Sequence, residues 1–255
     1  MTTDTHAEWL EEILPKHKRL TESVIVIIES LLKAEGIEYL AVVGRTKTKD
    51  GVLEKIKRKG YSDPSVRMTD ISGIRIILYS ESDVKKTSDL ISKSFTVDKK
   101  NSLDKSESMS VDKVGYRSVH FVCDLGSNRQ KLPEYVGLHN LKFEFQVRTI
   151  LQHAWAELSH DSSYKLSRKL PPELERKLFL YAGLLEVADK GFDEISSDID
   201  KYIEETGRFG VSDDTLIDAI TLNRFLDLWA EKNNFPIKQF NSNDDEGFLI
   251  SDLKE

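Results

Sequence analysis

The sequence has 255 residues, of which 39% are hydrophobic and 32% are charged, and its formal net charge is −7. This composition indicates a globular chain with a sizeable core, and the negative charge disfavours a general nucleic-acid-binding protein, which usually has a basic face. The single cysteine, Cys123, excludes an internal disulfide. The longest apolar run, residues 24–28, is far shorter than the roughly 18 residues of a membrane span, and the N-terminus lacks a signal-peptide pattern. We therefore expect a cytoplasmic protein with no membrane contact.

The first half of the sequence predicts helices around one buried strand. Residues 6–35 carry apolar side chains at helical spacing, and we expect this helix to break near Pro15. A short helix is predicted over 49–59 and a largely buried strand over 73–79. A helix over 83–94 and a strand near 95–98 follow. The polar stretch 99–113 has little periodicity and is predicted to be a loop.

The second half predicts two more strands, over 116–125 and 142–149, and then a helix over 150–165. Strands in the middle of a chain and helices at both ends are typical of an α+β domain. The predicted fold is therefore a mixed β-sheet flanked by helices, with long N-terminal and C-terminal helices.

Residues 173–205 form the clearest predicted helix, because apolar residues alternate at spacings of four and three over four heptads. They are Leu174, Leu178, Tyr181, Leu185, Ala188, Phe192, Ile195, Ile199 and Tyr202. Such a seam requires a partner helix. We expect the long N-terminal helix of the same chain to be that partner, while a second copy would instead give a homo-oligomer through the terminal helices.

The chain is predicted to consist of one domain over 1–205 and a helical extension with an acidic tail over 206–255. Residues 207–210 are expected to form a hinge, and Ser212 is expected to cap the last helix. The tail from Asn241 onward is polar and acidic, which favours poor order.

Two of the predicted strands carry ordered rows of polar side chains. Because side chains alternate along a strand, Glu144, Gln146 and Arg148 share one face of the strand 142–149. In the strand 116–125, Tyr116 and His120 share a face in the same way. A solvated sheet face would explain such rows equally well, but this set of side chains is richer in functional chemistry than solvation requires.

A basic cluster and an isolated carboxylate add to these rows. Arg45 and Lys47 precede a helix that contains Lys55, and together they could hold a polyphosphate, although a solvated helix face is an open alternative. Asp70 lies just before the buried strand that contains Arg75. It is either a turn former or a metal ligand at a strand edge.

Five segments in this order resemble the RelA/SpoT alarmone synthetase domain. They are Gly44-Arg45-x-Lys47 with Lys55, Asp70-Ile-Ser-Gly-Ile-Arg75, Gly115-Tyr116-Arg-Ser-Val-His120, Glu144-Phe-Gln-Val-Arg-Thr149, and Ala154-Trp-x-Glu157 with His160 and Tyr164-Lys165. Each segment alone is a weak signal, but five in one order are hard to explain by chance. The resemblance covers roughly residues 20–200.

The resemblance implies a nucleotidyltransferase-like fold and a pyrophosphokinase, in which the 3′-hydroxyl of GDP or GTP attacks the β-phosphorus of ATP and AMP leaves, giving (p)ppGpp. It implies that Asp70 binds Mg²⁺ and that Glu144 acts as the base and shares the metal. By the same resemblance the ATP-binding residues are Arg45, Lys47, Lys55 and Arg75. The acceptor nucleotide is expected to contact Tyr116, His120, Gln146, Arg148 and His153.

Two other functions stay open on the same sequence. A relative of these enzymes could place the diphosphate on the 3′ end of tRNA, although the net charge disfavours this acceptor. A non-catalytic nucleotide-binding regulator is the other alternative, which the presence of both Asp70 and Glu144 disfavours. His160 and Asp161 lack the partner residues of a metal-dependent hydrolase, so we expect no hydrolase activity.

Overall fold

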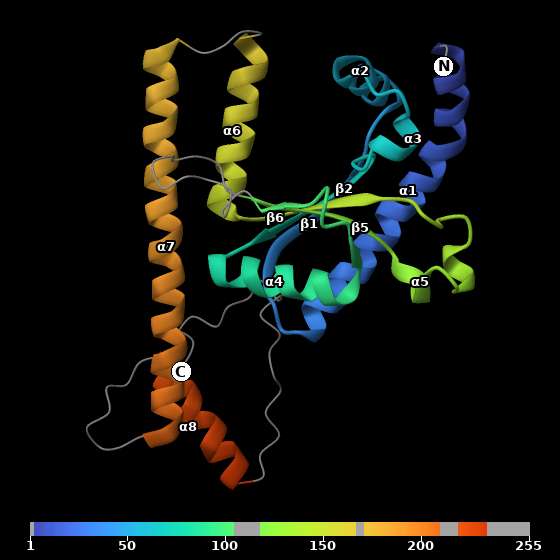
Figure 1. Ribbon diagram of the computed structural model, residues 1–255. Coiled ribbons are helices and arrows are strands. Elements are labelled where there is room, and N and C mark those ends of the chain that lie inside the picture. Colours follow the sequence, from blue (N-terminus) through green and yellow to red (C-terminus); the bar gives the residue numbers. More distant parts are fainter. Residues whose placement is uncertain (1–2, 105–117, 167–170, 210–218, 234–255) are drawn as a thin grey trace, which may run out of the picture. The chain divides into compact units, whose positions relative to one another are not determined.

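The computed structural model of the chain describes residues 3–104, 118–166, 171–209 and 219–233 (Figure 1). The chain divides into two compact units, Met1–Glu194 and Ile195–Glu255. Helix α7 (Pro172–Phe209) runs through this division, and α8 (Ala219–Lys232) belongs to the second unit. No helix within the described ranges is long and apolar enough to cross a membrane.

A mixed β-sheet forms the centre of the first unit. In the described part of the chain its strands follow the order β1-β2-β6-β5-β3, and β4 also pairs with β5. Strands β2 and β6 are parallel, whereas the other pairs are antiparallel. The strand bounds are β1 Tyr39–Thr46, β2 Ser72–Leu78, β3 Thr96–Val97, β4 Leu103–Asp104, β5 Val119–Asp124 and β6 Phe143–Thr149. The predicted α+β class with a mixed sheet is confirmed.

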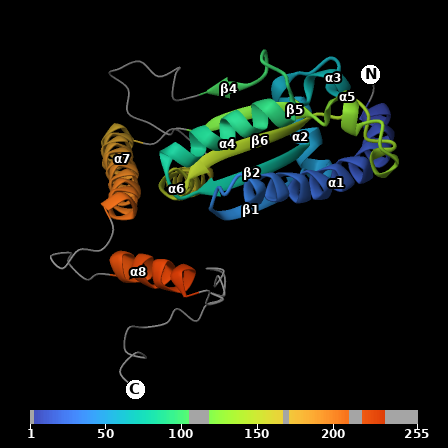
Figure 2. The same ribbon diagram turned by 90° about the horizontal axis from the view of Figure 1, so that it is seen from below.

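Helices α1 and α4 cover one face of this sheet, as Figure 2 shows from below. The remaining elements of the first unit lie around the sheet and at its ends. The helix bounds are α1 Thr3–Ala34, α2 Lys49–Lys59, α3 Pro64–Arg67, α4 Glu81–Ser94, α5 Gly126–Arg129, the 3₁₀ helix η1 Pro133–Tyr135, and α6 Ile150–Leu166. Because α1 and α4 occupy one face, polar side chains of the strands collect on the other.

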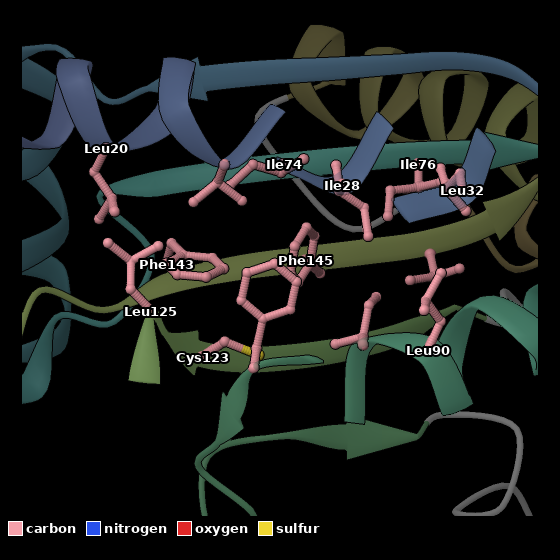
Figure 3. Close-up of a cluster of buried hydrophobic side chains, with 14 of the residues drawn as sticks. Leu20, Ile28, Leu32, Ile74, Ile76, Leu90, Cys123, Leu125, Phe143 and Phe145 are labelled. Atoms are coloured by element: carbon pink, nitrogen blue, oxygen red, sulfur yellow. The ribbon is translucent and has the colours of Figure 1, made fainter. Parts of the chain in front are cut away.

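The main hydrophobic core lies between the sheet and the two covering helices (Figure 3). Phe143 and Phe145 of β6 are fully buried, and each packs edge-to-face against Phe95, with ring centroids 5.6 and 5.2 Å away. Helix α1 contributes Leu20 and Ile28 to this core, at the helical spacing that the sequence predicted. The apolar rows of the strands and of α1 therefore form one continuous core.

We predict that Phe145→Ala lowers the free energy of unfolding by about 3–5 kcal/mol, because it removes a fully buried aromatic ring and leaves a cavity. Urea denaturation followed by circular dichroism measures this loss. Val66→Ala is the matched control, because Val66 is an exposed apolar residue of α3, and its substitution should change stability by less than about 0.5 kcal/mol. Equal stability of the two variants would contradict the prediction.

The predicted break near Pro15 is wrong, because α1 continues through this residue. The two sides of Pro15 are buried in different clusters. On the N-terminal side, Leu10 packs with Val52 and Ile56 of α2, whereas Leu20 and the residues after it pack in the main core. Burial on both sides offsets the backbone hydrogen bond that proline cannot donate.

Strand β1 was not predicted from the sequence. It is an edge strand with exposed side chains such as Val43, and Gly44 interrupts its apolar run. A Cβ atom at Gly44 would lie 2.5 Å from Ile25 Cδ1 and 2.6 Å from Thr21 Cγ2, so glycine allows α1 to approach the strand closely. The predicted loop 99–113 also contains the short strand β4, and residues 105–117 lie outside the described part.

Within the described part of the first unit, the apolar seam of α7 does not pack against α1, so the expected partner within the chain is wrong there. In the first unit Leu174, Tyr181 and Phe192 remain exposed. Helix α1 cannot cover them because its own apolar face is buried against the sheet. A different face of α7 is buried, through Ala182 and Asp189. The prediction of a homo-oligomer through terminal helices is untested.

The predicted hinge at 207–210 is helical over most of its length, because α7 extends to Phe209. Ser212 and the tail from Asn241 onward lie outside the described residues. The predicted domain boundary at residue 205 stays a prediction.

Candidate active site

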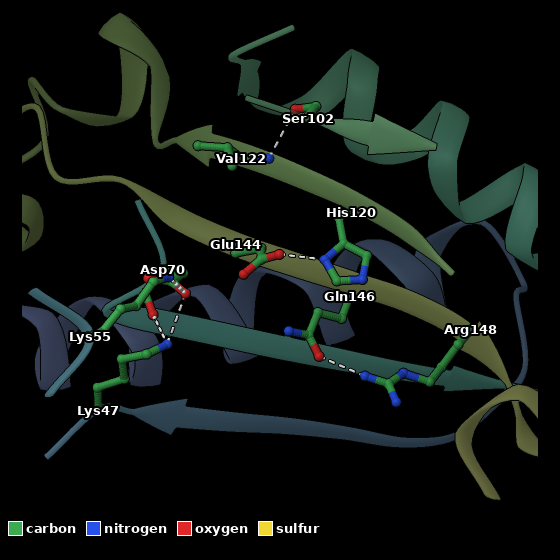
Figure 4. Close-up of polar contacts among 9 residues, drawn as sticks. All are labelled: Lys47, Lys55, Asp70, Ser102, His120, Val122, Glu144, Gln146 and Arg148. Carbon is green, nitrogen blue, oxygen red and sulfur yellow. Dashed lines mark hydrogen bonds and ion pairs between the residues drawn. The ribbon is translucent and has the colours of Figure 1, made fainter. Parts of the chain in front are cut away.

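The face of the sheet opposite α1 and α4 carries the polar side chains that the sequence predicted for β5 and β6 (Figure 4). In β6, Phe143 and Phe145 are buried in the core, while Glu144 and Gln146 alternate with them and point to the opposite side. His120 of β5 lies directly across from Gln146 in the antiparallel ladder. The described members of the expected rows, His120, Glu144 and Gln146, therefore lie on this face of two neighbouring strands.

Glu144 and His120 form a close pair on this face. His120 Nδ1 lies 2.5 Å from Glu144 Oε1, and both side chains are largely shielded from solvent. His120 Nε2 is buried and has no hydrogen-bond partner among the described residues. The imidazole thus orients the carboxylate on one side and has a second nitrogen that can contact a ligand.

Asp70 is the acceptor of two lysine side chains. Lys47 Nζ lies 3.0 Å from Asp70 Oδ2 and also donates to the backbone oxygen of Asp70 at 2.7 Å. Lys55 Nζ contacts the same Oδ2 atom. Burial raises the pKa of Asp70, but the hydrogen bond from Lys55 and the charge of Lys47 together outweigh it and hold the pKa below its ordinary value. The carboxylate is therefore charged at neutral pH.

Local packing places these three residues. Thr48 caps the N-terminus of α2 by accepting a hydrogen bond from the backbone N–H of Gly51, which starts the helix directly after Lys47. The neighbours of Lys55 and Asp70 in sequence, Ile56 and Ile71, pack in one apolar cluster. The basic segment and the carboxylate are thus fixed by a shared core and not by their own ion pairs alone.

Asp70 and Glu144 come together although they are 74 positions apart in sequence. Gly73, three residues after Asp70, pairs with Glu144 in the parallel β2–β6 ladder, and Figure 4 shows both carboxylates on the same face. Asp70 Oδ1 is buried and has no hydrogen-bond partner in the described part of the chain. A buried carboxylate oxygen without a hydrogen-bond partner, on the same sheet face as a second carboxylate, fits a divalent cation that prefers oxygen ligands.

The predicted arginines lie beside this pair. Arg45 of β1 is opposite Gly73, and Arg75 of β2 is opposite Val43, so the two arginines are diagonal neighbours on the same face. Arg75 Nη1 forms an ion pair with Glu157 Oε1 of α6 at 2.9 Å. The geometry allows one planar ligand to contact both guanidinium groups.

The far end of the polar row is closed by α6. Arg148 is only 3% exposed and donates to Gln146 Oε1 at 2.6 Å. Burial lowers the pKa of His153, the charges of Arg148 and Arg75 lower it further, and Glu157 acts in the opposite direction. His153 is therefore neutral at neutral pH. Tyr116, the remaining predicted residue, lies outside the described residues.

One buried polar group near the site was not predicted. His17 of α1 is 3% exposed, and its Nδ1 lies 2.8 Å from Ser72 Oγ at the start of β2. The signal was present in the sequence, because His17 falls on the helical face of Leu20, Val24 and Ile28. A histidine at the end of an apolar face indicates a buried, hydrogen-bonded imidazole.

We predict that acid weakens the fold through His17. Burial lowers the pKa of His17 to about 4, from an ordinary 6.5. Below pH 6.5 the unfolded chain therefore binds a proton that the folded chain does not, and the free energy of unfolding falls by about 3 kcal/mol between pH 6.5 and 4. Above pH 6.5 this residue contributes no pH dependence.

Urea denaturation at several pH values between 7.5 and 4 tests this prediction. His17→Asn should lack this part of the pH dependence because asparagine does not titrate. Protonation of Asp70 also lowers the free energy of unfolding, but only below the ordinary aspartate pKa of 3.8. The pH range of the Asp70 effect is therefore separate from the range between 6.5 and 4 that is assigned to His17. Identical slopes for the two proteins between pH 6.5 and 4 would contradict the assignment to His17.

The fold and the site together define an α+β domain with a carboxylate pair, a lysine pair and two arginines on one sheet face. Residues 44–169 match the family described as "Region found in RelA / SpoT proteins". The chain carries this RelA/SpoT region, and the resemblance predicted from its motifs is confirmed.

Two relatives of this chain come from Bacillus subtilis (strain 168). The chain is 29% identical over 170 residues to the GTP pyrophosphokinase YwaC, which covers 61% of this chain and 73% of that protein. It is 26% identical over 202 residues to the GTP pyrophosphokinase YjbM, which covers 75% of this chain and 90% of that protein.

Solved structures share the fold. A GTP pyrophosphokinase family protein from Streptococcus pneumoniae matches with a TM-score of 0.64 and 25% identity, covering 79% of this chain and 97% of that one. The small alarmone synthetase 1 from Bacillus subtilis bound to its product pppGpp matches with a TM-score of 0.62 and 25% identity. The match covers 75% of this chain and 98% of that one.

Proposed function

We propose that the protein is a GTP pyrophosphokinase that transfers the β,γ-diphosphate of ATP to the 3′-hydroxyl of GDP or GTP and releases AMP. The observation that carries this proposal is the convergence of the Glu144–His120 pair and the Asp70–Lys47–Lys55 cluster on one face of the sheet. The similarity to the GTP pyrophosphokinases YwaC and YjbM, which are 29% and 26% identical to this chain over 73% and 90% of their lengths, supports it.

Glu144 is the base in this proposal. Its carboxylate takes the proton of the ribose 3′-hydroxyl, the O3′–Pβ bond forms, and the bond from Pβ to the oxygen that bridges it to Pα breaks, so that AMP leaves. Because this transfer needs positioning and charge neutralisation more than covalent help, the protein has to hold two nucleotides in line. His120 keeps the Glu144 carboxylate in place through its Nδ1 contact.

Asp70 and Glu144 would together hold Mg²⁺. This cation, when bound, neutralises charge on the phosphates and keeps several waters, so one or two carboxylates are enough to bind it. Lys47 and Lys55 share Asp70 Oδ2, which leaves Oδ1 for the cation. The two lysines then supply positive charge on the side of the ATP phosphates.

The two nucleotides take different ends of the face. Arg45 and Arg75 would enclose the adenine of ATP, because they are diagonal neighbours on adjacent strands. Gln146, Arg148 and His153 would line the acceptor side, where His120 Nε2 is also available. Tyr116 stays the predicted platform for the guanine.

A product assay tests the proposal. The protein is incubated with Mg²⁺ and ATP labelled at the γ-phosphate, with GDP, GTP and tRNA offered in parallel reactions. The expected result is label on guanosine nucleotides and release of AMP. Label on tRNA alone would show that the acceptor is wrong, and no transfer to any acceptor would favour a nucleotide-binding regulator.

A further inference from the structure

A buried polar network lies on the core side of the sheet, behind the proposed site. Ser72 Oγ donates to the backbone oxygen of His17 at 3.0 Å, and Ser72 Oγ itself lies 2.8 Å from His17 Nδ1. A hydroxyl has one hydrogen to donate, so His17 Nδ1 must carry the proton that joins it to Ser72 Oγ. Ser72 is fully buried and His17 nearly so.

The network continues to a second strand. Thr21 Oγ1 donates to the backbone oxygen of His17 at 2.9 Å and lies 3.0 Å from Thr46 Oγ1 at the end of β1. One turn of α1 is thereby joined to the ends of both β1 and β2, which pair at Thr46 and Ser72. Four polar side chains in an otherwise apolar interface are costly unless they bond to one another, and here they do.

These strand ends lead directly to the site. Lys47 follows Thr46, and Asp70 precedes Ser72 by two residues. The backbone N–H of Lys47 donates to Ile71 O at 2.9 Å, which extends the pairing of the two segments. The network therefore holds the backbone from which the lysine and the carboxylate project, and among the described residues its hydrogen bonds involve neither the Lys47 nor the Asp70 side chain.

We propose that His17 is a positioning residue, which fixes Asp70 and Lys47 for cation and phosphate binding through Ser72 and Thr46. This inference rests on the proposed function, because it assigns the network to the same site. Helix α1 is thus part of the active-site support as well as of the core. If the network served stability alone, loss of His17 would weaken the fold without changing what the site binds.

The test uses the full chain and the ATP analogue AMPCPP, whose binding is measured by calorimetry at increasing Mg²⁺. His17→Leu and Ser72→Ala each break the network. His17→Asn is the conservative variant, because its Nδ2 can donate to Ser72 Oγ from the same position. Leu32→Ala is the stability control, because it opens a cavity further along the buried face of α1.

We expect His17→Leu and Ser72→Ala to raise the Mg²⁺ concentration for half-maximal AMPCPP binding at least about 10-fold, which corresponds to the weakening expected when a supporting partner of a metal ligand is lost. His17→Asn should stay within about threefold of the wild type, and Leu32→Ala should not change the requirement, even where urea denaturation shows it to be less stable.

An unchanged Mg²⁺ requirement in both network variants would overturn the proposal. Should His17→Leu fail to fold, Ser72→Ala decides alone, because it removes one oxygen atom and leaves the helix intact. A wild-type protein that binds AMPCPP with Mg²⁺ but makes no product would overturn the proposed function and not the network, since the binding measurement would still separate the variants.

Discussion

Glu144→Gln should lower the kcat of diphosphate transfer at least about 100-fold, while the KM for ATP changes less than about threefold. Glutamine has nearly the shape of glutamate, and its amide oxygen can still accept from His120 Nδ1. It cannot take the proton of the acceptor hydroxyl, and it carries no charge toward a cation. At saturating Mg²⁺, where the Asp70 carboxylate still provides a charged ligand for the cation, the loss should therefore appear in the chemical step, with the sheet and the ATP side unchanged.

Steady-state kinetics with γ-labelled ATP and the better of GDP and GTP measures this effect. Glu134→Gln is the matched control, because it makes the same chemical change at an exposed position of η1 and should keep the wild-type rate. If Glu144→Gln retained more than a tenth of the wild-type kcat, Glu144 would not be the base, and the role of its pair with His120 would have to be reassigned.

The alternation of side chains made the polar face predictable. Period two placed Glu144 and Gln146 opposite Phe143 and Phe145, and the structure confirms it because burial on one face leaves the register no freedom. Which residues touch was beyond this argument. The contact of His120 with Glu144 depends on β5 and β6 being neighbours, a pairing that period alone does not fix.

The features that the sequence did not predict have one physical cause: each of them is determined by tertiary packing and not by the local sequence pattern. Strand β1 is an edge strand interrupted by Gly44, and that glycine makes sense only once α1 lies against it. Helix α1 continues through Pro15 because two separate clusters bury its two halves. His17 was visible as a histidine on an apolar face, but its partner Ser72 is 55 positions away.

The apolar seam of α7 shows the opposite failure. Its heptad pattern was read correctly, since a helix forms over the whole predicted range. The predicted partner is wrong in the first unit because the sheet already buries the apolar face of α1. The buried face of α7 instead includes a polar contact with the sheet, in which Thr149 Oγ1 donates to Asp189 Oδ2 at 2.6 Å. A seam in a sequence thus specifies that a partner is needed without naming it.

Asp70→Asn should lower kcat/KM about 10²- to 10³-fold at low Mg²⁺ and recover part of that loss as Mg²⁺ is raised. Two effects add in this variant. The cation loses a charged ligand, and Lys47 and Lys55, which both contact Asp70 Oδ2, are left facing each other without a neutralising carboxylate. The second effect also weakens the hydrogen bond from Lys47 Nζ to the backbone oxygen of Asp70, because the lysine side chain is no longer held beside a carboxylate.

Comparison with Asp63→Asn separates these effects from general damage, because Asp63 is an exposed carboxylate of the same connection between α2 and β2 and should tolerate the change. The measurement is kcat/KM for each variant at Mg²⁺ concentrations from about 1 to 50 mM, and circular dichroism checks that each variant is folded. Partial rescue by Mg²⁺ assigns Asp70 to the cation. A loss of the same size at every Mg²⁺ concentration would place the role of Asp70 in holding Lys47 and Lys55, and the carboxylate pair would no longer account for metal binding.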